Sequence, residues 1–150
     1  MKKFFLLATL VSVIVFLWLT KPNHLYKRAT IKIGPNEIIT DVADTETLRE
    51  KGLGGREKLA ENEGMLFLFP EKYYYSFWMK GMIIPIDVVW LSDNEIIDIT
   101  ENLLPPKSNN NYLPSFRPKA PVNKVLEVNA GYAKAKGLKI GERVVVENIP

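Results

Sequence analysis

Two charged side chains interrupt the apolar segment SFWMKGMIIPIDVVW (residues 76–90), and they are the first candidates for chemistry. Lys80 follows Trp78 by two positions, and Asp87 lies among branched aliphatic residues. A carboxylate in such surroundings is costly unless it is paired or hydrogen-bonded. Its cation would be Lys80 or, if the fold brings it close, Arg56, whose guanidinium group suits a bidentate pair. Together Arg56, Trp78, Lys80 and Asp87 predict a small pocket that binds an anionic or hydroxylated ligand.

Two other functions are compatible with the same residues. In the first, Asp87 caps backbone groups or makes an ion pair that fixes strand register, while Lys80 extends over Trp78. The domain would then be a structural or protein-interaction module, and residues 105–121 would contact a partner protein. In the second, the domain is a hydrolase or lyase that acts on saccharides, which requires a carboxylate or lysine with a strongly shifted pKa in a cleft.

The composition excludes several kinds of active site. The chain has no cysteine, which removes disulfides, thiolate chemistry and cysteine-ligated metals. The single histidine, His24, lies in the segment that precedes the domain, so a Ser-His-Asp triad and a histidine-based metal site are excluded from the domain. We therefore assign no catalytic residue, no metal ligand and no cofactor.

The positive charge belongs to the N-terminal tail. The chain has 20 Lys and Arg against 17 Asp and Glu, and five of the basic residues precede Thr30, where there is no acid. The remainder has 15 basic and 17 acidic residues, a formal charge of −2. Because a nucleic-acid-binding surface is basic, we expect no nucleic-acid partner.

The tail itself has the composition of a membrane anchor. Residues 4–19 are an uncharged run interrupted only by Thr9 and Ser12, close to the length that spans a bilayer. Bulky residues end the run, whereas a cleavage site needs small ones. We expect residues 1–20 to be an uncleaved signal anchor in the cell membrane, with the domain on the extracytoplasmic side. Cleavage and the reverse orientation remain open alternatives. Residues 21–30 would then be a linker, and residues 31–150 the globular domain.

Alternating polarity and turn residues predict the elements of that domain. A strand pair surrounds the turn at residues 34–36, and residues 44–52 form a helix with Asp44 or Thr45 as N-cap and Gly52 at its end. The remaining predictions are a helical turn in 56–64, strands at 65–69, 73–80, 86–91, 96–100, 123–128 and 140–149, a long loop at 101–122, and a helix in 129–139 with Asn129 as N-cap and Gly137 as its end.

Strand parity divides residues 73–80 into two faces. Side chains alternate along a strand, so Tyr74, Ser76, Trp78 and Lys80 share a polar and aromatic face. The other face, Tyr73, Tyr75, Phe77 and Met79, is expected to be core. The register between this strand and the next is left free by the connection 81–85, so the sequence does not decide whether Lys80 meets Asp87.

The order of several motifs resembles a known family. VADTxxLRxKGL, EGMLFLFP, SFWMKGMIIPIDVVWL, a Pro-rich loop and VLEVNAGYAKAKGLKIGERV follow one another as in the domain of unknown function 192 family of bacteria and archaea, over Ile31 to Val146. The resemblance implies a single small α+β domain with a curved, mostly antiparallel sheet that forms a partial barrel, and two or three short helices. It implies frequent export but no established activity, cofactor or substrate.

The resemblance also points to residues. Recurrent polar positions of the family correspond here to Arg56, Glu63, Trp78, Lys80, Asp87 and Glu127, among which Glu63 and Glu127 would support the ligand-binding four. Many relatives have Asn where this chain has Gly81, and some have cysteines in the Pro-rich loop, where this chain has none. We expect a membrane-tethered domain that binds a small polar or anionic ligand, or a component of the cell envelope.

Overall fold

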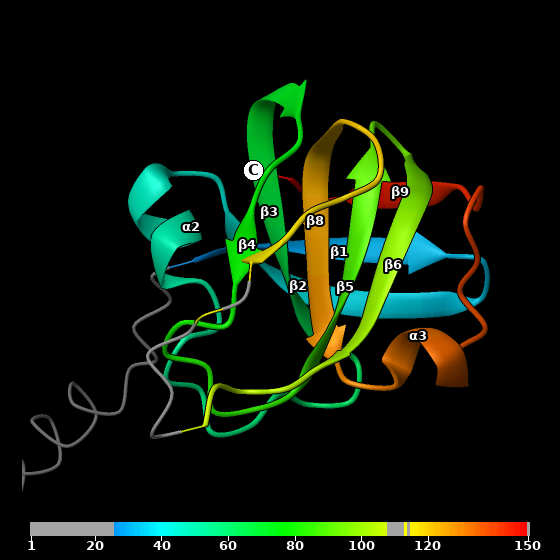
Figure 1. Cartoon of the computed structure of the whole chain (residues 1–150). Coiled ribbons are helices and arrows are strands. Elements are labelled where there is room, and N and C mark those ends of the chain that lie inside the picture. The colour runs from blue at the N-terminus through cyan, green and yellow to red at the C-terminus, as the bar shows by residue number, and fades with distance from the viewer. Residues whose placement is uncertain (1–25, 108–112, 114, 150) are drawn as a thin grey trace, which may run out of the picture.

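A curled sheet of seven strands forms the body of the domain, with two short helices against it (Figure 1). The computed structural model describes residues 26–107, 113 and 115–149. The elements are β1 (Lys27–Ile33), β2 (Asn36–Ala43), α2 (Glu46–Lys51), β3 (Glu63–Tyr73), β4 (Phe77–Trp78), β5 (Ile86–Ser92), β6 (Glu95–Leu103), β7 (Ser115–Phe116), β8 (Val122–Asn129), α3 (Tyr132–Ala135) and β9 (Val144–Glu147).

The strand order in the sheet is β6-β5-β8-β3-β2-β1-β9, and β4 pairs with β7 in a separate two-stranded ribbon. Within the sheet β2 and β3 run parallel, and the other neighbouring pairs are antiparallel. The predicted α+β domain with a curved, mostly antiparallel sheet is therefore confirmed.

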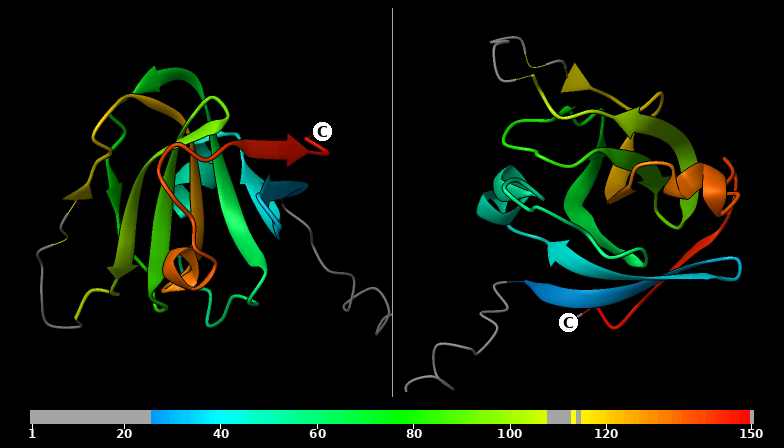
Figure 2. Two further views of the ribbon diagram at one scale, coloured as in Figure 1. Left: turned by 90° about the vertical axis from the view of Figure 1, so that its right-hand side faces the viewer. Right: turned by 90° about the horizontal axis from the view of Figure 1, so that it is seen from below.

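The curl brings the two ends of the strand order together. Ile96 on β6 and Val144 on β9 belong to the same buried cluster, although five strands separate β6 from β9. The backbone N–H of Ile96 donates to the carbonyl of Glu142 at 3.0 Å, and that of Val144 donates to Asn94 at 2.8 Å. The sheet is thus a half-barrel whose inner face holds this cluster, and α3 lies in its opening (Figure 2).

A second cluster covers the outer face of the central strands. Consecutive residues of β8, Val125 and Leu126, are both buried but belong to different clusters, as do Leu66 and Phe67 on β3. Because side chains alternate along a strand, both faces of the sheet are covered here. This explains the continuous apolar runs of β3 and β5, which are typical of strands without a solvent-facing side.

Most of the predicted elements are present. The helix begins after Thr45, whose hydroxyl accepts a hydrogen bond from the N–H of Leu48, and ends at Gly52. The turn between β5 and β6 places Asp93 at a φ of 54°, a conformation that Asp tolerates better than most residues. The pattern of exposure along residues 74–80 also follows the predicted faces, since Trp78 and Lys80 are exposed and Met79 is buried.

Three predictions of local structure are wrong. Residues 56–62 form turns and coil and no helical turn, and residues 73–80 are split between the end of β3 and β4, with Tyr73 exposed. Asn129 is the last residue of β8, and α3 follows Gly131. The amide of Asn129 donates to the carbonyls of Leu59 and Ala60 at 3.2 and 2.8 Å, so a contact distant in sequence takes the side chain that was expected to cap α3.

The expected anchor, residues 4–19, lies outside the described residues, as does part of the long loop, at 108–112 and 114. Within the described ranges, no helix has the length and apolar character to cross a membrane. The loop is shorter than predicted, because β6 continues to Leu103 and β7 occupies Ser115–Phe116.

Candidate functional site

An open pocket lies on the outer face of the sheet, where α2 and β4 face β3 and β8. Its volume is about 230 Å³. It is lined by residues of α2 and the turn after it, of β3 and β8, and of the segment 75–82; they are Glu46, Arg49, Glu50, Lys51, Gly52, Leu53, Gly54, Phe67, Phe69, Tyr75, Ser76, Phe77, Trp78, Lys80, Met82 and Glu127. In Figure 1, α2 lies to the left of β4, and β4 lies in front of β3.

Glu127 is the buried carboxyl group of this pocket. It lies on β8, and its cross-strand partners are Met65 on β3 and Val88 on β5, which are both buried. Glu127 itself is only 5% exposed, and its Oε2 atom has no hydrogen-bond partner among residues 26–107, 113 and 115–149. Buried polar atoms are nearly always hydrogen-bonded to protein or to water, so this oxygen is a candidate contact for a small molecule that enters the pocket.

Burial changes the protonation of this carboxyl group. Loss of hydration raises the pKa of Glu127 from the ordinary 4.5 to about 8, while the positive charge of Arg56 acts in the opposite direction. The group is therefore mainly the neutral acid at pH 7. A neutral carboxylic acid both donates and accepts a hydrogen bond, whereas the carboxylate only accepts.

Packed aromatic rings form the apolar side of the pocket. Phe69 and Tyr75 are stacked with centroids 3.7 Å apart, and Phe67 meets Phe77 edge to face at 5.0 Å. Trp78, 52% exposed, is also among the lining residues. These rings hold one another in place, so the apolar wall of the pocket is preformed.

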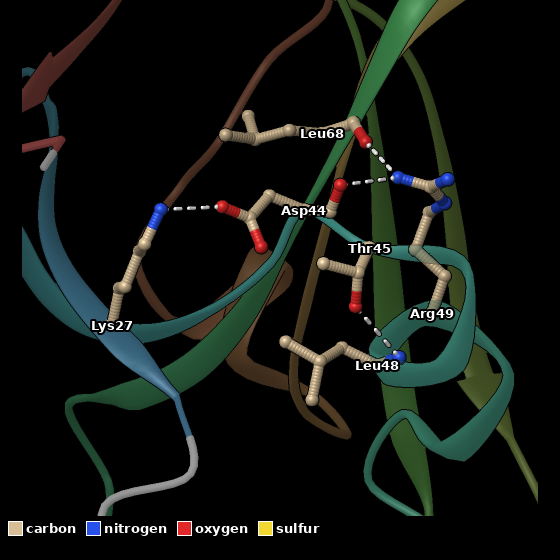
Figure 3. A network of polar contacts seen from close by, with 6 residues as sticks. All are labelled: Lys27, Asp44, Thr45, Leu48, Arg49 and Leu68. Carbon is tan, nitrogen blue, oxygen red and sulfur yellow. Dashed lines mark hydrogen bonds and ion pairs between the residues drawn. The ribbon is translucent and has the colours of Figure 1, made fainter.

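Polar contacts fix α2 as the opposite wall (Figure 3). Nη1 of Arg49 donates to the carbonyls of Asp44 and Leu68, each at 2.9 Å, and thereby ties the helix to β3. Lys27 pairs with Asp44 at 2.9 Å just before the helix, and the Thr45 cap completes the network. Arg49 also lies 5.2 Å above the ring of Phe69, which joins this wall to the aromatic one.

The charged residues around the pocket have a small positive excess. Three cations, Arg49, Lys51 and Lys80, face the two glutamates of α2, Glu46 and Glu50, while Glu127 is mainly neutral. The Nζ atom of Lys80 lies 5.9 Å from the ring of Trp78, as its position two residues later predicts. The pocket thus combines an aromatic wall, a buried acid and a mixed charged rim.

The structure brings together only part of the predicted site. Trp78, Lys80 and Glu127 line the pocket. Arg56 and Glu63 instead line a small neighbouring cavity, where Nη2 of Arg56 donates to Asp41 at 2.6 Å. Arg56 is not among the residues that line the pocket, but its positive charge lowers the pKa of Glu127.

Asp87 has a different environment from the one that the binding hypothesis expects. It is fully buried, and its two carboxylate oxygens accept from backbone N–H groups, Oδ1 from Asn102 at 2.8 Å and Oδ2 from Ala133 at 3.0 Å. Neither Lys80 nor Arg56 is among its partners in the described part of the chain. This matches the alternative in which Asp87 caps backbone groups; it connects β5 to β6 and to α3.

The residues around the pocket that sequence reasoning missed are on α2 and β8. Glu127 was given only a supporting place, although the run Leu126-Glu127-Val128 carries the same signal as Asp87, a carboxylate in an apolar strand. Glu46 and Glu50 carry no such signal, since an exposed face of a helix is usually charged. Among the residues that the structure describes, no cluster of His, Asp and Glu has the geometry of a metal site.

Comparisons with known proteins bear on the fold and the family. A crystal structure of a candidate transcription regulator from Sinorhizobium meliloti 1021 is similar, with 28% identity and a TM-score of 0.70 over 84% of this chain and 97% of that one. A protein of unknown function from Novosphingobium aromaticivorans DSM 12444 is 28% identical, with a TM-score of 0.68 over 79% of this chain and 83% of that one. No curated protein matches this chain significantly.

The sequence profile of the family DUF192, described as "Uncharacterized ACR", matches residues 29–146. That region contains every strand that contributes to the pocket, together with α2. The chain therefore belongs to the domain of unknown function 192 family.

Proposed function

We propose that this domain binds a small polar ligand in the pocket between α2 and β4. The observation that carries the proposal is the unpartnered Oε2 of Glu127, a buried acid in the wall of an open cavity. Leaving such an atom without a partner costs roughly 1–3 kcal/mol, and a bound ligand would recover part of that cost. Ligand sites commonly combine apolar walls with a few polar groups, and this pocket has both.

The residues have separate roles in the proposal. Glu127 makes the directional hydrogen bond, and the aromatic wall that includes Trp78 provides the contact area. Lys80 approaches polar substituents from the rim. Asp87 and Arg56 act indirectly, Asp87 by holding α3 and β6 in place and Arg56 by moderating the acidity of Glu127.

Localisation is part of the proposal. The apolar segment 4–19 would tether the domain to the cell membrane and place the pocket on the extracytoplasmic side, where the ligand could be a component of the cell envelope. The Sinorhizobium meliloti relative is described as a candidate transcription regulator. The formal charge of −2 on the part of this chain after the tail does not favour contact with DNA.

Thermal unfolding of the full-length protein tests the proposal. The protein would be screened against small ring compounds that are neutral, cationic or anionic, in a detergent without a sugar headgroup. A ligand should raise the melting temperature of the wild type. It should do the same for the control variant Ser92→Ala, because Ser92 is a polar residue of β5 that does not line the pocket. It should raise the melting temperature of Trp78→Ala much less. If no compound in the screen distinguishes Trp78→Ala from the wild type, the proposal is wrong.

An enzyme is the second candidate, and one observation favours it. A carboxyl group whose pKa is about 8 is poised to act as a general acid at neutral pH. The reaction class would be acid-assisted cleavage of a saccharide, as a hydrolase or lyase. Turnover of a saccharide panel that is abolished in Glu127→Gln would establish this candidate, whereas binding without turnover would leave the domain as a binding module.

A further inference from the structure

We infer that the part of the ligand that enters the pocket is an uncharged hydroxylated ring, of the size of one saccharide unit, and that one of its hydroxyl groups pairs with the buried carboxyl group of Glu127. This inference rests on the proposed function and narrows it to a chemical class.

The surroundings of Glu127 favour an uncharged partner. Its neighbours across the sheet, Met65 and Val88, are apolar and at most 1% exposed, so a charge brought beside Glu127 would lose most of its hydration. A hydroxyl group carries no such cost. It can accept from the neutral acid and donate to its other oxygen, which satisfies an atom that the protein leaves unpartnered.

A cationic ligand fits poorly, although aromatic pockets often bind cations. The faces of two wall rings already have protein cations near them. Arg49 lies 5.2 Å from the ring of Phe69, and Lys80 lies 5.9 Å from that of Trp78. A third cation would have to displace one of these side chains or endure its repulsion. Displacing Arg49 would also break its two hydrogen bonds to the backbone.

An anionic group beside Glu127 fits no better. Arg56, whose charge acts on Glu127, is already paired with Asp41 at 2.6 Å. Lys51 and Lys80 lie among the lining residues, but Glu46 and Glu50 offset them, and the third cation, Arg49, is held by the carbonyls of Asp44 and Leu68. The lining therefore has an excess of only one positive charge, and the side chain that supplies it is already committed to the backbone.

Size and shape point to a single ring. The volume of about 230 Å³ is smaller than that of most sites for drug-sized ligands, which hold roughly 300–1,000 Å³. The ring of Trp78, 52% exposed, presents apolar surface at the pocket, and the stacked pair Phe69 and Tyr75 adds apolar ring edges to the same wall. Saccharide rings have one face of C–H groups that packs against aromatic rings and an edge of hydroxyl groups, which together match the wall and Glu127.

The test compares matched sugars that differ only in charge. Neutral methyl glycosides, 2-amino sugars and uronates of the gluco, galacto and manno series would be titrated into the full-length protein at pH 6.5. The protein would be kept in a detergent without a sugar headgroup, and the indole N–H signal of Trp78 would be followed by NMR. We expect at least one neutral glycoside to bind five-fold or more tightly than its amino and uronate counterparts.

Variants of Glu127 assign the contact. Glu127→Gln keeps a neutral donor and acceptor, so it should bind the neutral glycoside within about three-fold of the wild type. Glu127→Leu should lose ten-fold or more, and Glu37→Gln, which changes an exposed carboxylate of β2 outside the pocket, should bind as the wild type does. Melting curves of each variant show that it is folded before binding is compared.

The outcomes separate this inference from the proposed function. Preference for an amino sugar or a uronate, or equal binding by Glu127→Leu, would overturn the inference and leave a ligand-binding pocket in place. Binding by no sugar in any series would also overturn it. The proposed function would then fail only if the wider thermal screen with Trp78→Ala were negative as well.

Discussion

At the scale of single residues, Glu127 is the clearest source of pH dependence in the stability of the domain. Its pKa is about 8 in the folded protein and near 4.5 when exposed, so the folded state holds a proton that the unfolded state releases. The protonated Glu127 therefore leaves the free energy of unfolding unaffected below pH 4.5, where the folded and unfolded states both hold the proton. The free energy of unfolding falls as the pH rises from 4.5 to 8, because only the unfolded state releases the proton over this range. Over that window the free energy of unfolding should fall by about 1.4 kcal/mol per pH unit, relative to a protein without this group.

Glu127→Gln should remove this dependence. Denaturant unfolding of the wild type and the variant at pH 5, 6, 7 and 8 measures it, with Glu63→Gln as the control on the neighbouring strand β3. As the pH rises, the free energy of unfolding of the wild type should fall steadily relative to that of Glu127→Gln. A difference that is constant between pH 5 and pH 8 would show that Glu127 is ionised in the folded protein.

Substitution of Asp87 should have the opposite effect to Glu127→Gln, because it should lower the stability of the domain. Asp87→Asn replaces one of two acceptor oxygens with an NH2 group that faces a backbone donor, either Asn102 or Ala133. The loss of a buried hydrogen bond to a charged acceptor should lower the free energy of unfolding by roughly 2–3 kcal/mol. Chemical denaturation measures it against Glu37→Gln, an exposed carboxylate on β2, which should change it by less than about 0.5 kcal/mol. A similar small effect for Asp87→Asn would contradict the structural role.

These two carboxylates show what sequence reasoning can do at this scale. Strand parity was enough to place Trp78 and Lys80 on one exposed face, because parity is a local property. It could not tell Asp87 from Glu127, since both interrupt apolar strands. Which of them meets backbone N–H groups and which meets a cavity depends on α3 and α2, elements that pack from elsewhere in the chain.

At the scale of elements, α2 is the part of the pocket whose stability depends most on a few contacts. It has only six residues, none of them buried, so its cap and the anchoring of Arg49 must hold it. Thr45→Ala should cost about 1 kcal/mol of stability, as the loss of an N-cap hydroxyl usually does. Hydrogen exchange should show faster exchange at Leu48 and Arg49, while Thr45→Ser, which keeps the hydroxyl, should resemble the wild type. Unchanged exchange in Thr45→Ala would mean that Arg49 alone holds the helix.

The elements also show where local signals are sufficient. The boundaries of α2 were predicted to within one residue, with Asp44 or Thr45 as the N-cap and Gly52 at the end, because a cap is made within one turn of the helix. The N-terminus of α3 was not, because Asn129 lies in β8 and its amide binds carbonyls about 70 residues earlier in the chain. The two carbonyls belong to Leu59 and Ala60, in the segment 56–62 that adopts coil rather than the predicted helical turn. Capping rules use only residues near the helix end, so they cannot predict that a side chain will instead bind a segment distant in the sequence.

At the scale of the whole molecule, the curl of the sheet has to be read from the structure. The sequence predicts antiparallel strands but not that β6 returns to the segment before β9, where Asn94 and Ile96 exchange backbone hydrogen bonds with residues 141–144. That closure brings strands from both ends of the chain into one inner core and leaves the outer face of β3 and β8 for the pocket. The resemblance to a family with a curved sheet anticipated the shape, whereas periodicity alone did not.

The last prediction concerns the expected anchor, segment 4–19, because it would determine the cellular compartment in which the pocket is exposed to its ligand. Alkaline phosphatase joined after Pro150 folds only where its disulfides form, outside the cytoplasm, and this chain brings no cysteine to interfere. In a bacterial host the fusion should be active and remain in the membrane fraction after an alkaline wash, because an uncleaved apolar segment holds it there. The same fusion without residues 1–25 should be inactive. Activity in the soluble extracytoplasmic fraction would instead indicate cleavage, and an inactive membrane-bound fusion the reverse orientation.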